Sequence, residues 1–158
     1  MEVEIEHVQL DFIKEIENNI CSLKVGSNIL CFALKSGLLF LIDLDKPSEV
    51  FKCQVPLLTA SNNAEKLIGM WMSPNSKKLF LKTNFAKYYL CDVDAIKHKY
   101  ADQGKLNSKP GGIYTVKKLI KKNWDIRVVN WCDDNKFLAG TVDGNVLLIN
   151  SVNKDGKL

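Results

Sequence analysis

The sequence predicts an all-β fold: a partial β-propeller of about three blades, each an antiparallel four-stranded sheet, forming the front part of a larger propeller. Three segments of equal length align without gaps, and they are 30–44 (LCFALKSGLLFLIDL), 79–93 (LFLKTNFAKYYLCDV) and 137–151 (FLAGTVDGNVLLINS). Each contains an apolar run, a short break and a second apolar run, which is the pattern of a β-hairpin. A further strand-like run precedes each hairpin. The whole unit recurs after roughly 50 to 60 residues, which indicates propeller blades.

The first predicted blade spans 20–56, and its strands are 21–25, 29–34, 38–44 and 50–55. The continuous apolarity of 29–34 predicts burial on both faces, as between stacked sheets. The alternation of 50–55 is typical of a half-exposed outer strand, and Pro56 ends it.

The second and third blades repeat this order. The second spans 66–120, with strands at 67–72, 78–83, 87–93 and, after an insertion, 113–120, where Lys117 and Lys118 are expected to point outward. The third spans 125–151, with strands at 126–132, 136–140 and 146–150, and no fourth strand follows. An open stack would leave an apolar face uncovered, so we expect further blades beyond Leu158.

Residues 5–12 (IEHVQLDF) alternate between apolar and polar side chains, as a half-buried strand does. They precede the first blade, which already has a fourth strand of its own at 50–55. Ring-closed propellers pair a free sheet edge with a strand from the other end of the chain. We therefore expect 5–12 to be the ring-closing strand of a single propeller domain, of which 1–158 is the N-terminal part.

The insertion at 94–111 is the longest connection that carries no predicted structure of its own. It contains glycine, proline and mutually repelling lysines, and long connections of this kind are usually functional or mobile. We expect it to be the most mobile internal segment and a candidate partner-contact loop. Its candidate contact residues are Lys97, His98, Lys99, Lys105 and Lys109.

Catalytic and metal-binding patterns are missing from the sequence. It has no phosphate-binding loop, nucleophile elbow or dinucleotide fingerprint, and its two histidines, His7 and His98, are far apart. We therefore expect no catalytic residues, no metal and no cofactor, and hence no enzyme. The three tryptophans, Trp71, Trp124 and Trp131, are expected to pack between blades.

The five cysteines show no paired spacing. Cys21, Cys31, Cys91 and Cys132 lie in apolar runs, so we expect them to be inert buried thiols in a reducing compartment. Cys53 lies in the outer strand and is the thiol with the best chance of reactivity.

The net charge of +4 is unevenly distributed, because 94–123 carries eight lysines against Asp94 and Asp102. Such a stretch is compatible with a solvated surface, and also with contact to nucleic acid or anionic lipid. No apolar run approaches the roughly 20 residues of a membrane span, and the N-terminus has no secretory pattern, so residence in the cytosol is expected.

Four blocks of residues occur along the chain as an ordered set of motifs: Ile5–Phe12, Asp43–Pro47, Met72–Pro74 with Leu81–Leu90, and Val129–Trp131 with Gly140–Gly144. This ordered set resembles the N-terminal region of the Pep three or deep orange family, also called vacuolar protein sorting eighteen. Their order and approximate spacing agree over essentially the whole chain. Two positions depart from the family, which tends to have glycine in place of Ala86 and arginine in place of Lys87. The family's helical region and C-terminal RING-type zinc module have no counterpart here.

The resemblance implies a subunit of the class C tethering complexes HOPS and CORVET. Such a subunit takes part in endosome-to-vacuole or lysosome transport, in vesicle docking and in fusion. Its expected partners are other class C subunits, with Rab GTPases and SNAREs reached indirectly through the complex. Its expected location is peripheral, on the cytoplasmic face of late endosome and vacuole or lysosome membranes.

An unrelated WD-like scaffold propeller is the alternative interpretation, with RNA contacted through the lysines of 94–123. The repeat lacks the Trp-Asp ending and Gly-His opening of WD40 blades, which counts against a standard member of that class. We accordingly expect no nucleic-acid partner. Recovery of class C subunits would favour the first interpretation, and recovery of salt-sensitive RNA the second.

Overall fold

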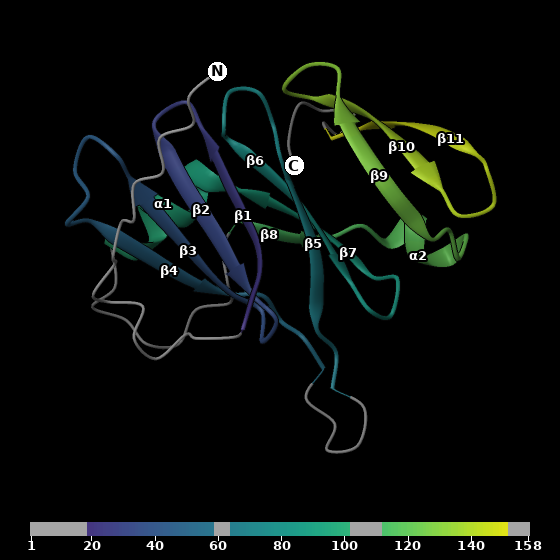
Figure 1. Ribbon diagram of the computed structural model, residues 1–158, viewed down its shortest axis with the longest axis horizontal. Helices are drawn as coiled ribbons and strands as arrows, with labels where there is room; N and C mark the ends of the chain where they lie inside the picture. The colour runs from purple at the N-terminus through teal and green to yellow at the C-terminus, as the bar shows by residue number, and fades with distance from the viewer. Residues whose placement is uncertain (1–18, 59–63, 102–111, 152–158) are drawn as a thin grey trace, which may run out of the picture.

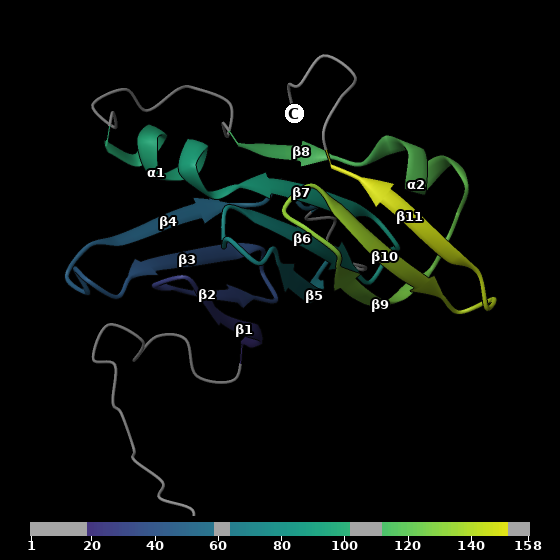
Figure 2. The ribbon, with the colours of Figure 1, turned by 90° about the horizontal axis from the view of Figure 1, so that it is seen from above.

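The computed structural model describes residues 19–58, 64–101 and 112–151, and these form three antiparallel sheets that follow one another as the blades of a partial propeller (Figure 1). The predicted ring-closing strand at 5–12 lies outside the described residues. Seen from above, the sheets splay from their first strands and do not close a ring (Figure 2).

Each blade is a meander, because its neighbouring strands are consecutive in the chain. Blade 1 contains β1 (Ile20–Gly26), β2 (Ile29–Leu34), β3 (Leu38–Asp43) and β4 (Val50–Gln54). Blade 2 contains β5 (Leu67–Met72), β6 (Lys78–Thr83), β7 (Tyr88–Asp92) and β8 (Ile113–Thr115). Blade 3 contains β9 (Ile126–Trp131), β10 (Lys136–Thr141) and β11 (Val146–Asn150), so its described part has three strands.

The three hairpins share one register, which confirms the repeat seen in the sequence. Phe32 pairs with Phe40 in blade 1, Leu81 with Tyr89 in blade 2, and Ala139 with Leu147 in blade 3. The first residue of each pair lies on the second strand at the same distance from the loop. The predicted equivalence of Phe32, Leu81 and Ala139 is therefore confirmed.

The loop of each hairpin ends in a residue with positive φ. The values are 90° at Gly37, 52° at Ala86 and 78° at Gly144. A left-handed backbone suits glycine, whereas an alanine there is strained by its Cβ. Blade 2 therefore keeps the conformation of the other two loops with a less favourable residue.

Replacing Ala86 by glycine should raise the free energy of unfolding by about 0.5 kcal/mol. Relief of left-handed strain, about 1 kcal/mol, is partly offset by losing the methyl group, which packs against the apolar cluster between blades 2 and 3. The control is Gly144→Ala, where an added Cβ would meet no atom within 4 Å. This control should lose about 1 kcal/mol from backbone strain alone in urea unfolding. A destabilised Ala86→Gly variant would mean that methyl packing outweighs the strain.

Alternate side chains on each hairpin point to opposite faces of its sheet. In blade 1, Cys31 and Leu41 pack toward blade 2, whereas Phe32 and Phe40 stack on the other face with ring centroids 4.6 Å apart. Both faces are buried, as the continuous apolarity of 29–34 predicted. This alternation places one apolar cluster between blades 1 and 2 and another between blades 2 and 3.

One face of the blade 3 sheet points away from blade 2, and we call it the next-blade face. It is made by Val128, Leu138, Val146 and Leu148. These residues are 56%, 40%, 72% and 66% exposed. By the hairpin register, Leu138 and Leu148 occupy the positions of Phe80 and Leu90, which blade 2 buries against blade 3. The face is thus built to receive a sheet, and no described residue covers it.

Two predictions for the second blade are wrong. Residues 93–101 form helix α1 (Val93–Ala101) and not a loop, because Asp92 Oδ1 accepts a hydrogen bond from the Ala95 amide at 2.9 Å and so caps the helix. The last predicted strand, 113–120, stops at Thr115 and is followed by helix α2 (Lys117–Lys121). The apolar residues Val116, Leu119 and Ile120 have helical spacing, which the prediction overlooked.

Candidate functional site

The candidate site is the channel side of the propeller, where the first strands of the three blades meet. β1 lies beside β5, and β5 lies beside β9 (Figure 1). Gly26 allows β1 to lie close to blade 2, because a Cβ at this position would lie 3.3 Å from Met72 Sδ and 2.6 Å from Ser76 Oγ. The junctions between the blades hold these strands in place.

A buried lysine joins blades 2 and 3. Lys82 lies on β6 and is 8% exposed, and its ammonium donates to the Asp125 carboxylate and, at 2.6 Å, to the Ile126 carbonyl. A buried ammonium is tolerated because it is paired and hydrogen-bonded. The sequence carried a signal for this role, a lysine inside the apolar run LFLKT, which sequence reasoning missed.

Tyr88, on β7, joins the same two blades. Its hydroxyl donates to the Trp124 carbonyl at 2.7 Å and accepts from the Ile126 amide at 2.9 Å. The ring stacks on Phe80 at 5.5 Å between centroids. Burial raises the pKa of the Tyr88 hydroxyl, which therefore remains protonated and able to donate.

The other end of this junction is polar. Lys78 Nζ donates to Asn135 Oδ1 at 2.6 Å and to Ser151 Oγ at 3.0 Å. The Asn75 backbone amide donates a hydrogen bond to Asp134 Oδ1 at 2.9 Å. Blades 2 and 3 are therefore tied at both ends, which fixes β9 relative to β5.

Helix α1, which follows the third strand of blade 2, contacts blade 1 and so joins the two blades. Lys97 Nζ lies 3.4 Å from Asp43 Oδ2 and 5.6 Å from the centroid of the Phe51 ring. Hydrogen bonding by the Asp45 amide, together with the Lys97 ammonium, lowers the pKa of the Asp43 carboxyl. Ile96 is buried in the cluster between blades 1 and 2. Lys97 is thus a bridging residue between blades and not part of a free loop.

Of the remaining members of the predicted contact loop, two lie on α1 and two fall outside the described residues. His98 is exposed on α1, and Lys99 lies on the same helix. Lys105 and Lys109 fall outside the described residues. Contact with a partner through these residues remains a prediction, as does the mobility of the segment beyond the helix.

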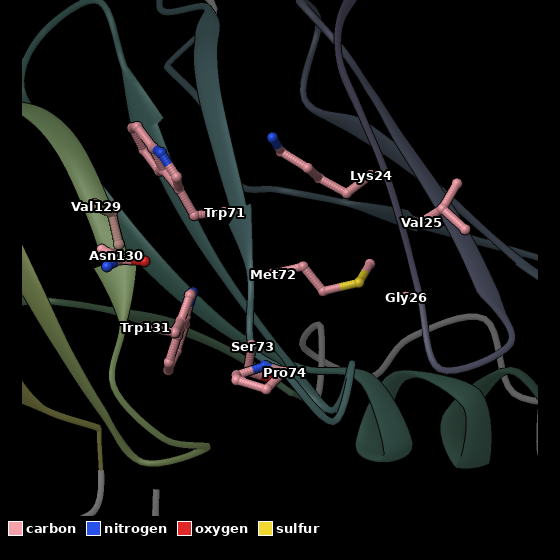
Figure 3. Close-up of a pocket in the computed structure, with 10 residues that line it drawn as sticks. All are labelled: Lys24, Val25, Gly26, Trp71, Met72, Ser73, Pro74, Val129, Asn130 and Trp131. Carbon is pink, nitrogen blue, oxygen red and sulfur yellow. The ribbon is translucent and has the colours of Figure 1, made fainter.

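A pocket of about 380 Å³ opens between the first strands of the three blades (Figure 3). Its lining comprises Lys24, Val25 and Gly26 from blade 1, Trp71, Met72, Ser73 and Pro74 from blade 2, and Val129, Asn130 and Trp131 from blade 3. The volume is in the range of ligand-binding pockets, roughly 300 to 1,000 Å³. Sequence reasoning did not anticipate this site, since its residues come from three separate repeats.

The tryptophans were predicted to pack between blades, and they do. Trp71 lies 6.0 Å from Phe80 and Trp131 lies 4.7 Å from Phe137, measured between ring centroids. All three are partly buried against the cluster between blades 2 and 3. Trp71 and Trp131 additionally line the pocket, so their rings serve both the core and the channel surface.

The thiols differ from prediction at Cys132 and at Cys21, which is half-buried. Cys31 and Cys91 are buried as expected, but Cys132 is exposed, because it follows the end of β9 at the turn into β10. Cys53, predicted to be the most reactive, is half-buried, and burial raises its pKa to about 12. A thiol that remains protonated at neutral pH is a poor nucleophile.

Stability should fall in alkali. Burial raises the pKa of Cys31, Cys53 and Cys91 above that of an unfolded thiol, about 8.5. As the pH rises, these thiols lose their protons in the unfolded chain before they do so in the folded one. The stabilisation that they contribute is therefore complete below about pH 8 and is lost as the pH rises toward 12. Under reducing conditions, the urea concentration at the unfolding midpoint should decrease as the pH is raised from about 8 to about 10.5. The decrease should be smaller in Cys53→Ala, which lacks one of these thiols. If the midpoint decreased equally with pH in the variant and in the parent, Cys53 would not contribute to this loss of stability.

The described residues contain neither a cluster of metal ligands nor a helix that could span a membrane. Across 19–58, 64–101 and 112–151, no three His, Cys, Asp or Glu side chains gather as metal ligands would. Neither of the helices described, α1 or α2, has the length and apolarity required to traverse a bilayer.

A solved propeller domain shares this fold. The chain superimposes on the beta-propeller domain of Myceliophteria thermophila Cps50 (Swd1) with a TM-score of 0.56 and 14% identity. The match covers 88% of this chain and 40% of that one, so this chain spans well under half of that structure. Kluyveromyces lactis Hsv2 matches with a TM-score of 0.46 and 13% identity over 79% of this chain and 39% of that chain. At these identities the likeness concerns the fold alone.

Sequence comparison identifies the family. No curated protein matches the sequence. The profile of the Pep3/Vps18/deep orange beta-propeller domain matches residues 1–157, which is nearly the whole chain. The resemblance drawn from the ordered motifs is therefore confirmed, and this chain belongs to the Pep3/Vps18/deep orange beta-propeller family.

Proposed function

We propose that this chain is a non-enzymatic interaction module of a class C membrane-tethering subunit, of the HOPS or CORVET type. It acts in vesicle docking and fusion during endosome-to-vacuole or lysosome transport. Its location is peripheral, on the cytoplasmic face of late endosome and vacuole or lysosome membranes. The observation that carries the proposal is the family match over residues 1–157.

The described surface suits a binding role. The channel pocket presents apolar side chains to solvent, among them Val25, which is 62% exposed. Exposed apolar patches on propellers and other soluble domains mark sites of protein association. The partners we propose are other class C subunits, with Rab GTPases and SNAREs reached through the assembled complex.

A pulldown with the tagged chain tests the proposal. The other class C subunits should be recovered, and recovery should survive nuclease treatment. The competing interpretation, an RNA-binding scaffold, has one observation in its favour: Lys117, Lys121 and Lys122 are exposed on and beside α2. A variant with these three lysines changed to glutamate should retain class C subunits if tethering is correct.

Two results would count against tethering. One is recovery of RNA that is lost at higher salt and abolished in the triple lysine variant, because phosphate contacts release counterions and weaken with salt. The other is failure to recover any class C subunit with the folded chain, verified by its cooperative thermal unfolding.

A further inference from the structure

The channel pocket has a marked imbalance of charge and hydrogen-bonding groups. Among its ten lining residues there is one cation, Lys24, and no carboxylate. Lys24 is exposed, and no described residue forms an ion pair with it. A ligand that complements this pocket must therefore bring its own negative charge or hydrogen-bond acceptor.

The uncharged polar side chains Ser73 and Asn130 add little to what Lys24 offers a ligand. Ser73 Oγ is already engaged, since it donates to Asn75 Oδ1 at 2.9 Å and accepts from the Lys78 amide at 3.0 Å. The Asn130 side chain is exposed, but Asn130 pairs with Leu138 and therefore points to the next-blade face, away from Lys24. Lys24 is thus the charged group that the pocket offers to a ligand.

The walls of the pocket are aromatic and apolar. Figure 3 shows the Lys24 side chain extending from β1 toward β5, with Met72 between β1 and β5 and with Trp71 and Trp131 on the side of β9. Trp71, Met72 and Trp131 are each partly exposed. Tryptophan and methionine offer a large, polarizable surface for an inserted aromatic or aliphatic side chain.

We propose that this pocket binds an extended acidic peptide segment that carries a large apolar side chain beside its carboxylate. The apolar side chain lies against Trp71 and Trp131, and the carboxylate pairs with Lys24, on the side of β5 where Met72 lies. Nucleic acid fits the pocket less well, because phosphate backbones are held by several cations and this lining has one. The proposal rests on the chemistry of the pocket and does not depend on the tethering role.

The three tryptophans provide an internal readout, since each contributes one indole N–H signal to a proton–nitrogen correlation spectrum. Trp71 and Trp131 line the pocket, whereas Trp124 does not. The probe is the acetylated, amidated peptide Gly-Asp-Phe-Glu-Gly, titrated into the full 158-residue chain. It is taken to about 1 mM, within the weak range expected for a short flexible peptide. The signals of Trp71 and Trp131 should shift saturably while that of Trp124 stays in place.

Matched peptides and variants separate the two contacts. Gly-Asn-Phe-Gln-Gly lacks the charge and Gly-Asp-Ala-Glu-Gly lacks the ring, and each should bind at least about fivefold more weakly. Lys24→Glu should weaken binding of the first peptide by about tenfold. Lys35→Glu, an exposed lysine of the same blade outside the pocket, should bind like the parent. Equal thermal midpoints would show that both variants are folded.

Four outcomes would overturn the proposal. They are the absence of a saturable shift at the highest peptide concentration, an equal shift of Trp124, equal binding by Lys24→Glu and Lys35→Glu, and a stronger pocket response to a single-stranded oligonucleotide than to the acidic peptide.

Discussion

Replacing Leu90 by alanine should lower the free energy of unfolding by about 2 to 5 kcal/mol, whereas Leu148→Ala should change it by less than about 0.5 kcal/mol. The two leucines occupy the same position of the repeat, in the third strand of blades 2 and 3. Leu90 is 9% exposed and packs into the cluster between these blades, and Leu148 is 66% exposed on the next-blade face. The difference measures what a neighbouring sheet contributes at one repeat position.

Urea unfolding of both variants, followed by tryptophan fluorescence, provides the comparison. A further control is Leu41→Ala, at the equivalent position of blade 1, where the side chain is fully buried between blades 1 and 2. It should resemble Leu90→Ala. If Leu148→Ala proves as costly as Leu90→Ala, another part of the chain covers the next-blade face and the assignment of that face as open is wrong.

Tyr88→Phe should cost about 2 to 4 kcal/mol, because removal of one hydroxyl leaves two backbone groups without partners. These groups are the Trp124 carbonyl and the Ile126 amide, and Ile126 is fully buried. The phenyl ring and its stacking on Phe80 remain in the variant. The expected loss is therefore attributable to the hydrogen bonds that join blade 2 to blade 3.

Tyr89→Phe is the matched control, since it removes a hydroxyl from the adjacent residue. Tyr89 donates one hydrogen bond, to the Pro56 carbonyl at 3.2 Å, so its loss should cost about 0.5 to 1.5 kcal/mol. Amide exchange gives a second measurement: the Ile126 amide should lose more protection in Tyr88→Phe than in Tyr89→Phe. Equal unfolding free energies for the two variants would show that the Tyr88 hydroxyl is not the bridge between blades.

Local pattern in the sequence was sufficient to predict the hairpins. Runs of alternating or continuous apolar residues, separated by breaks at Gly37, Ala86 and Gly144, specify strands and loops because side chains alternate faces along a strand and positive φ suits few residues. The threefold repeat then predicted the blades and the equivalence of Phe32 and Leu81. This worked because each strand is encoded by its own few residues.

Where local signals were short, the prediction failed. Helix α1 was taken for a loop because its apolar residues are few, and its stability comes from Ile96 packing between blades and from Lys97 reaching Asp43. These partners are distant in sequence, so no local window contains them. Cys132 was placed in the core because it ends an apolar run, yet the turn after β9 exposes it.

By itself, then, the sequence determined the three hairpins, their order, the equivalence of their positions and the family, since all four depend on the type and spacing of neighbouring residues. The tertiary structure alone decided which face of each hairpin meets which neighbour, and it paired Lys82 with Asp125 and Tyr88 with Trp124 across a blade junction. It also brought Lys24, Trp71 and Trp131 around one pocket. The reason is physical: each blade contributes one short strand to the channel, and the docking of whole sheets, driven by apolar burial, sets the distances between them.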